Sequence, residues 1–183
     1  MLIVDRFDRA GVVRIGYVSA LTMLEAKDGD IGSYLDIAAA IEETSPTTAV
    51  DLHELWRRIA FGVLISNTDD HLRNHGFLHA GGNTWTLSPA FDLNPDPAPG
   101  PKHLSTTIDH HDTSASISTL ISVARLFRLA EADAIAVLRE VVSATRRWRE
   151  RAETHGLPAA GIADMKSAFE HHEAEVATSL VGL

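Results

Sequence analysis

Apolar positions recur with helical spacing through the middle of the chain. The clearest stretch runs from Asp51 to Ser66, where apolar side chains return every three or four positions. These positions are Leu52, Leu55, Trp56, Ile59, Ala60, Val63 and Leu64. Asp51, followed three residues later by Glu54, has the form of a capping box, which marks a helix start. The pattern predicts a buried helix over residues 51–66.

Other amphipathic stretches lie on both sides of this helix. Ser33–Thr44 has its apolar residues close to one face and predicts a shorter helix. From Ser116 onward two apolar stripes predict two further helices, and we expect a last helix over Ile162–Leu180. The C-terminal third is therefore predicted to be helical.

Short segments rich in β-branched residues predict a smaller amount of strand. Leu2–Val4 and Val12–Val18 are such segments near the N-terminus. Gly76–His79 and Thr84–Ser88 flank the sequence Ala-Gly-Gly-Asn, which tolerates positive φ and predicts a β-hairpin. We therefore expect a mostly α protein of the α+β class.

Composition and charge limit the class of protein. With 183 residues and 45% hydrophobic content, the chain is long enough for one core and favours a single globular unit. A net charge of −9 would repel a phosphate backbone, so we expect no direct binding to nucleic acid. The absence of cysteine excludes disulfides and thiol chemistry and fits a reducing compartment.

The sequence gives no sign of export or of membrane insertion. Its N-terminus acquires Asp5 and Asp8 at once and lacks the basic and then apolar order of a signal peptide. The longest apolar run, Ile59 to Ile65, is far below the roughly 20 residues that a membrane span needs. We expect a cytoplasmic protein.

The polar stretch after the predicted central helix carries the candidate chemistry. Phosphoryl transfer from ATP needs a carboxylate that deprotonates the attacking hydroxyl, and oxygen ligands that hold Mg²⁺ against the phosphates. The spacing Asp-x-x-x-x-Asn meets this need in protein kinases, and here it joins Asp69 to Asn74. A second metal ligand is expected beyond a short hairpin, where Asp92 stands.

These residues resemble the HipA family of serine/threonine kinases, the toxins of bacterial toxin-antitoxin pairs. The match consists of the segments Asn-Thr-Asp-Asp-His-Leu-Arg-Asn at 67–74, Gly-Phe-Leu at 76–78 and Ser-Pro-Ala-Phe-Asp at 88–92. The resemblance implies that Asp69 is the general base and that Asn74 and Asp92 bind Mg²⁺. It also implies that His71 and Phe91 lie beside the ATP.

The first residues resemble the hinge of this family, the strand whose backbone receives adenine. The segment Leu-Ile-Val-Asp-Arg-Phe-Asp-Arg at 2–9 carries this likeness, and it implies that Asp5 and Phe7 lie at the nucleotide. By the resemblance residues 1–183 form one HipA-like C-terminal domain. It comprises a hinge and last N-lobe strand region at 1–18, a catalytic helix, loop and metal-binding segment at 51–92, and C-terminal helices at 114–183.

HipA-like kinases carry a Gly-rich loop and a phosphate-binding lysine ahead of the hinge, where this sequence begins. Neither Lys27 nor Lys102 stands on a strand before the hinge. We expect the chain by itself to be a weak kinase or an inactive one.

The resemblance implies a toxin kinase acting on a protein Ser or Thr, with an aminoacyl-tRNA synthetase among the family's targets. The implied partners are a separate N-lobe subunit and a helix-turn-helix antitoxin. Two alternatives stay open at this point: a split or truncated interaction module without catalysis, and a metal-dependent phosphohydrolase that uses Asp69, Asp70, His71 and Asp92.

Several other polar residues are interpreted as structural. Asp70 is expected to be solvated or to cap the loop. The Asp-His-His-Asp run at 109–112 is read as a polar loop, because adjacent histidine side chains diverge and no third ligand is apparent. His171 and His172 are expected on a solvated helix face.

Overall fold

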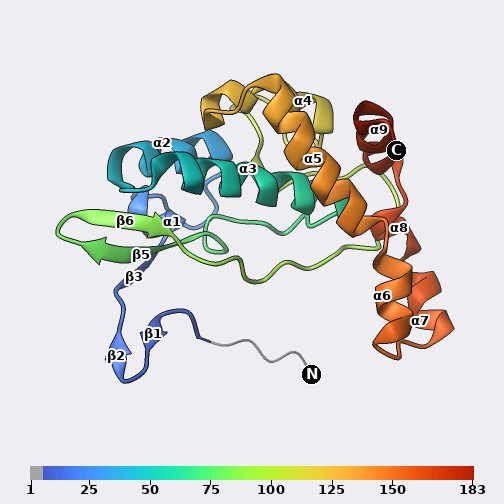
Figure 1. Cartoon of the computed structure of the whole chain (residues 1–183), viewed down its shortest axis with the longest axis horizontal. Helices are drawn as coiled ribbons and strands as arrows, with labels where there is room; N and C mark the ends of the chain where they lie inside the picture. Colours follow the sequence, from blue (N-terminus) through green and yellow to red (C-terminus); the bar gives the residue numbers. More distant parts are fainter. Residues whose placement is uncertain (1–5) are drawn as a thin grey trace.

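The computed structural model describes residues 6–183, and its elements lie in layers around one central helix, α3 (Figure 1). The strands are β1 (Arg9–Ala10), β2 (Val13–Arg14), β3 (Tyr17–Ser19), β4 (Gly32–Ser33), β5 (Gly76–Gly81), β6 (Thr84–Leu87) and β7 (Thr106–Thr107). The helices are α1 (Ala20–Met23), α2 (Tyr34–Thr44), α3 (Thr48–Leu64), α4 (Ile117–Ser122), the 3₁₀ helix η1 (Ala124–Phe127), α5 (Glu131–Thr145), α6 (Trp148–Thr154), α7 (Ala159–Asp164), α8 (Lys166–Phe169) and α9 (His172–Val181).

The largest sheet is antiparallel, with strand order β3-β5-β6. The predicted hairpin is present, since β5 pairs with β6 and places Phe77 opposite Leu87. Gly81 and Gly82 both have positive φ in the connecting turn, the conformation that glycine adopts without strain. This hairpin returns the chain after β6 toward the loop that precedes β5.

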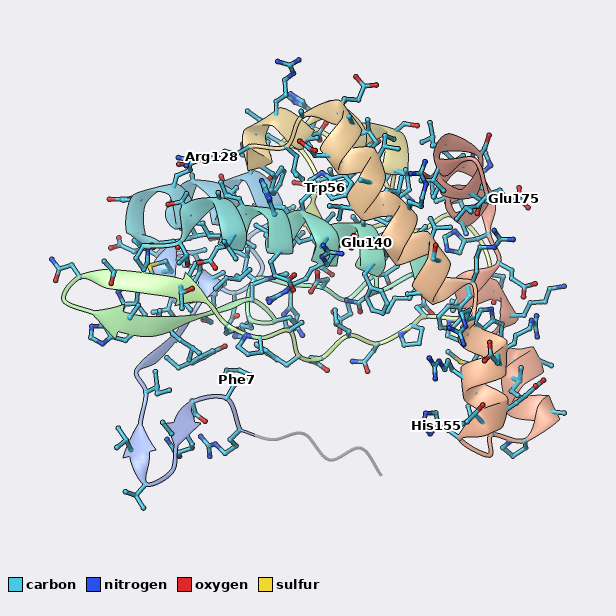
Figure 2. All side chains as sticks on the ribbon, in the orientation of Figure 1. Phe7, Trp56, Arg128, Glu140, His155 and Glu175 are labelled. Atoms are coloured by element: carbon cyan, nitrogen blue, oxygen red, sulfur yellow. The ribbon has the colours of Figure 1, made fainter. Side chains whose placement is uncertain are left out.

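Helix α3 forms the centre of the core because its apolar face is buried along its whole length. It packs between α2 and the sheet on one side and α4 and α5 on the other. Trp56 is fully buried and donates its indole N–H to the carbonyl of Leu120, at 3.3 Å (Figure 2). The periodicity of residues 51–66 therefore predicted the right element and the right face.

The predicted start of α3 is wrong. The helix begins at Thr48, and Asp51 lies within its first turn instead of capping it. The Asp51 carboxylate accepts hydrogen bonds from Ser45, Thr86 and the Leu87 backbone, so tertiary contacts use the side chain that the pattern assigned to a cap. A capping box does occur in α2, between Ser33 and Asp36.

Two other predicted elements are interrupted in the structure. The expected strand over 12–18 is split into β2 and β3, and Leu2–Val4 lies outside the described residues. The single helix expected over 162–180 is instead the three short helices α7, α8 and α9. The breaks let Phe169 stack on Trp148, with ring centroids 4.6 Å apart, while α9 packs against α5. The mostly α, α+β class is confirmed.

Candidate active site

The candidate catalytic loop begins where α3 ends. Ser66 has positive φ, and the backbone N–H of Asn67 turns back to the carbonyl of Gly62, so the chain leaves the helix axis sharply. Asn67 is buried, and its side-chain oxygen accepts a hydrogen bond from the backbone of Asn94, at 3.2 Å. The end of the buried helix thus holds the catalytic loop and the segment after β6 together.

Asn74 and Asp92 meet across this junction, although 18 residues separate them. The Asn74 Nδ2 donates to the Asp92 Oδ2 at 2.7 Å, and the Asn94 Nδ2 donates to the Asp92 Oδ1 at 2.7 Å. Asp92 also has a positive φ of 57°, which is uncommon for a residue other than glycine and is often found at functional sites. The two predicted metal ligands are therefore brought together, and Asn94 is an orienting partner that the sequence pattern did not indicate.

The donor atoms at this junction fit Mg²⁺. The Asn74 Oδ1 is buried and has no hydrogen-bond partner among residues 6–183, so it is an oxygen available to a ligand. Mg²⁺ is commonly held by one or two protein oxygens together with phosphate oxygens. The described residues contain no cluster of three or more His, Cys, Asp or Glu side chains that could hold a metal by themselves. A site made of Asn74, Asp92 and nucleotide phosphates agrees with both observations.

The predicted base, Asp69, projects from the same loop and is exposed to solvent. The residue before it, Thr68, is fixed through its carbonyl oxygen, which accepts hydrogen bonds from the Ser105 backbone and the Ser105 hydroxyl, both at 3.0 Å. An exposed carboxylate on a tethered loop can reach the hydroxyl of an incoming acceptor.

Asp70 corrects the sequence interpretation, because its side chain is neither solvated nor a loop cap. Only 4% of the residue is exposed, and the Tyr34 hydroxyl donates to its Oδ2 at 2.6 Å. Burial by itself would raise the pKa of the Asp70 carboxyl. The contacts with His75 and Tyr34 outweigh that effect and hold the pKa below its usual value.

An aromatic group forms around Phe91, the residue before Asp92. The rings of Phe7 and Phe91 lie 5.7 Å apart, and Tyr17 completes the group at 6.1 Å from Phe7 and 6.5 Å from Phe91. Burial raises the pKa of Tyr17. The structure thus brings together two of the predicted nucleotide residues, Phe7 and Phe91, and adds Tyr17. Asp5 lies outside the described residues.

His71 lines a cavity of about 310 Å³ together with Lys27, Ile31 and Arg73, and neither Phe7 nor Phe91 is among the residues that line it. The place of His71 beside the nucleotide stays a prediction.

Lys102 is bound within the Pro-rich segment. Its ammonium group donates to the Asp96 Oδ2 at 2.9 Å and to the carbonyl oxygens of Asp96 and Ala98. The Asp96 carboxylate also accepts from the Thr68 hydroxyl at 3.4 Å, so this ion pair joins the Pro-rich segment to the catalytic loop.

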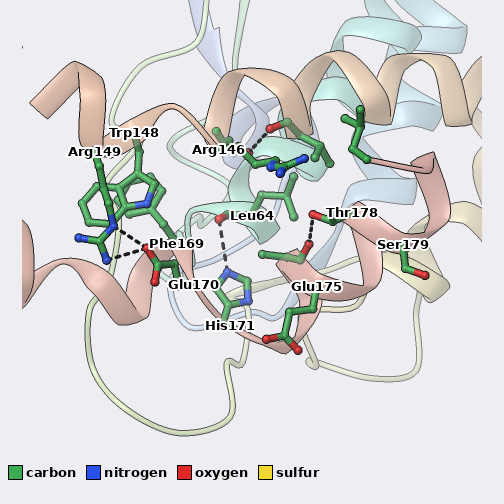
Figure 3. Close-up of a pocket in the computed structure, with 14 residues that line it drawn as sticks. Leu64, Arg146, Trp148, Arg149, Phe169, Glu170, His171, Glu175, Thr178 and Ser179 are labelled. Atoms are coloured by element: carbon green, nitrogen blue, oxygen red, sulfur yellow. Dashed lines mark hydrogen bonds and ion pairs between the residues drawn. The ribbon is translucent and has the colours of Figure 1, made fainter.

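Another cavity lies away from these residues, near the C-terminus (Figure 3). Its volume is about 600 Å³, and its walls come from α5, α6, α8, α9 and the last residue of α3, Leu64. His171 lies in this wall with its Nε2 3.3 Å from the carbonyl oxygen of Leu64, so the expectation of a solvated His171 is wrong. None of the predicted site residues that the structure describes lines this cavity.

The comparisons with known proteins show the family of the chain. The profile of the HipA-like C-terminal domain matches residues 1–149. The chain belongs to this family. It is also 32% identical over 181 residues to the protein described as "Putative kinase Y4dM" from Sinorhizobium fredii (strain NBRC 101917 / NGR234), in an alignment that covers 89% of this chain and 41% of the relative.

The match to the HipA-like C-terminal domain includes every candidate site residue and ends inside α6. Helices α7, α8 and α9, and much of the wall of the C-terminal cavity, follow the matched region. The chain spans about two fifths of the length of the relative. Among residues 6–183, every helix is too short or too polar to cross a membrane.

Proposed function

We propose that this chain is the catalytic C-lobe of a HipA-like serine/threonine protein kinase, which transfers the γ-phosphoryl group of ATP to a protein hydroxyl. The observation that carries the proposal is the 2.7 Å contact between Asn74 and Asp92, on a loop that presents the exposed Asp69 five positions before Asn74. The base and one metal ligand thus come from the catalytic loop, and the second ligand comes from the segment after β6, so the junction brings together the groups that phosphoryl transfer uses.

The chain's own residues supply three functions in this reaction. Asp69 accepts the proton of the Ser or Thr hydroxyl as its oxygen attacks the γ-phosphorus, and the bond to the bridging oxygen of ADP breaks. The Asn74 Oδ1 and the Asp92 carboxylate hold Mg²⁺. When bound, the ion supplies positive charge to the β- and γ-phosphates. Phe7, Tyr17 and Phe91 offer aromatic surface on the side of Asp92 where we place the nucleotide base.

From the family resemblance we propose further that the protein is a cytoplasmic toxin, held in check by a helix-turn-helix antitoxin, with an aminoacyl-tRNA synthetase as its class of target. The phosphohydrolase alternative is weakened by Asp70, one of its four residues. The Asp70 carboxylate is already occupied by Tyr34 and lies within 3.1 Å of His75.

The test compares Asp69→Asn with Asn74→Ala and Asp92→Asn in the longest form of the protein that can be expressed, following radiolabelled phosphate from ATP. We expect Asp69→Asn to lower kcat by about 10²- to 10⁴-fold while Mg²⁺-dependent ATP binding, measured by calorimetry, stays unchanged. Asn74→Ala and Asp92→Asn should weaken that binding by about tenfold or more, because the first removes an oxygen ligand and the second removes the negative charge of one.

Asp133→Asn, an exposed substitution at the start of α5, serves as the matched control and should leave both quantities unchanged. Full transfer by Asp69→Asn would remove Asp69 as the base. A wild-type protein that binds ATP and Mg²⁺, yet labels no protein and releases no phosphate, would establish the interaction module instead.

A further inference from the structure

The Asp70 carboxylate lies at the centre of a buried polar cluster that the proposed chemistry does not use. Tyr34, Asp70 and His75 are 2%, 4% and 3% exposed. The Tyr34 hydroxyl donates to the Asp70 Oδ2 at 2.6 Å, and the His75 Nε2 lies 3.1 Å from the same oxygen. The His75 contact has the distance of an ion pair but lacks the alignment of a hydrogen bond. The Tyr34 and His75 rings meet edge to face at 5.5 Å.

This cluster holds both ends of the catalytic loop at one point. Asp70 follows the proposed base directly, and His75 follows the proposed metal ligand Asn74 directly. Three backbone contacts support the same geometry. The Thr106 hydroxyl donates to the Asp70 carbonyl at 2.6 Å, the Asn74 N–H to the His71 carbonyl at 2.8 Å, and the Ala20 N–H to the His75 carbonyl at 2.7 Å.

The cluster of Tyr34, Asp70 and His75 also accounts for the direction of the Asp69 side chain. Adjacent side chains in a non-helical segment project to different sides of the backbone. The buried, tethered Asp70 therefore leaves Asp69 facing solvent, as observed. A loop held only by the chain at its two ends would let the base adopt several orientations. Small displacements of a catalytic group lower the reaction rate strongly.

The energetics favour a role beyond packing. A buried carboxylate stabilises a fold less than an apolar side chain of similar volume would, because desolvation costs much of what its partners return. Buried polar clusters are instead suited to selecting one arrangement among several of similar energy. Tyr34 is close to Asp70 in space but distant in sequence, since it is the first residue of α2 and precedes Asp70 by 36 positions.

We propose that the cluster of Tyr34, Asp70 and His75 is a positioning element that fixes how the loop presents Asp69 and Asn74, and that Tyr34 is its positioning residue on α2. This inference rests on the proposed phosphoryl transfer and adds a residue 35 positions before the base that no motif of the catalytic loop contains.

Tyr34→Phe is the sharpest test, because it removes one hydroxyl and keeps the ring that packs on His75. We expect kcat for phosphotransfer to fall by about tenfold or more, with a smaller rise in KM for ATP, because a displaced Asn74 still leaves Asp92 to hold Mg²⁺. Amide hydrogen exchange within residues 67–75 should become faster. Asp70→Asn should give the same pattern, and the double variant should be no slower than the slower single variant, because the two side chains act as one unit.

Trp56→Phe is the matched control for stability. It removes another buried donor, the indole N–H that bonds to Leu120, from the same core. It should lower the melting temperature and leave kcat and exchange in residues 67–75 unchanged. Equal losses of kcat in Trp56→Phe and Tyr34→Phe, measured where both are folded, would overturn the positioning role.

Hydrogen exchange separates failure of this inference from failure of the proposed function. If the longest expressible form of the wild-type protein transfers no phosphate, the kinase proposal fails, while exchange in residues 67–75 still tests the cluster. Unchanged exchange and unchanged kcat in Tyr34→Phe would overturn the cluster and leave the kinase proposal standing.

Discussion

At the scale of single residues, His171 connects the C-terminal cavity to the helix that leads into the catalytic loop. Its ring lies against the carbonyl of Leu64, the last residue of α3. Burial lowers the pKa of His171, and the positive charge of Lys102 lowers it further. The hydrogen bond to Leu64 and the negative charge of Glu173 raise the pKa but do not offset burial. The neutral imidazole is therefore the form that the folded protein prefers.

A depressed pKa in the folded state makes the protein less stable in acid, through linkage. Above the ordinary histidine pKa the contribution of the neutral ring is fully present, and it is lost as pH falls through the lower folded value. We predict that the free energy of unfolding drops more steeply between pH 7 and pH 5 in wild type than in His171→Gln, measured by urea titration. His172→Gln, at the exposed neighbouring position, should follow the wild-type profile. Parallel curves for wild type and His171→Gln would contradict the assignment.

At the scale of elements, α3 and β6 are joined through the Asp51 carboxylate. The residue is 6% exposed and accepts hydrogen bonds from the Thr86 hydroxyl, the Leu87 backbone at 3.0 Å and the Ser45 hydroxyl at 2.7 Å. Because β6 leads the chain back toward Asp92, this contact fixes the position of β6 relative to α3.

We predict that Asp51→Ala lowers the free energy of unfolding by about 2–3 kcal/mol, because several donors lose their acceptor inside the protein. Chemical denaturation measures the change. Glu153→Ala, an exposed substitution at the end of α6, should stay within about 0.5 kcal/mol of wild type. A loss for Asp51→Ala no larger than the control would show that water replaces the missing carboxylate.

Periodicity predicted the interior of the elements better than their ends. The apolar face of α3 and the glycines of the hairpin followed from local rules of spacing and backbone freedom. The start of α3 and the breaks near Glu170 did not, because contacts with Thr86 and Trp148, distant in sequence, decide them. For the site, spacing placed Asn74 and Asp92 together. Asp69 and Asp70 are the same residue type, and their environments differ through Tyr34 and His75, which are distant from Asp70 or follow it in the chain and which local spacing does not reveal.

At the scale of the whole molecule, the β1–β2 hairpin packs little against the rest of the described structure. Figure 1 shows it set apart from the layers around α3. Each strand has two residues, and Val12 is 99% exposed at the tip. A two-stranded hairpin has marginal stability in water by itself. Exposed apolar residues on such an edge are suited to pairing with another segment.

We predict that this hairpin is covered by a polypeptide of the kind that Y4dM carries outside its alignment with this chain. The chain spans 41% of Y4dM, so the part of Y4dM outside the alignment, added as a separate polypeptide, is the available probe. Amide exchange within residues 9–19 should slow on mixing, because strand pairing protects backbone N–H groups, while exchange in α5 should stay unchanged.

Phosphotransfer should rise in the same mixture and vanish in Asp69→Asn. Val12→Lys should weaken the protection, because it places a charge on the covered edge. Equal exchange in residues 9–19 with and without the added polypeptide would show that the hairpin is not the docking surface, whatever the level of phosphotransfer.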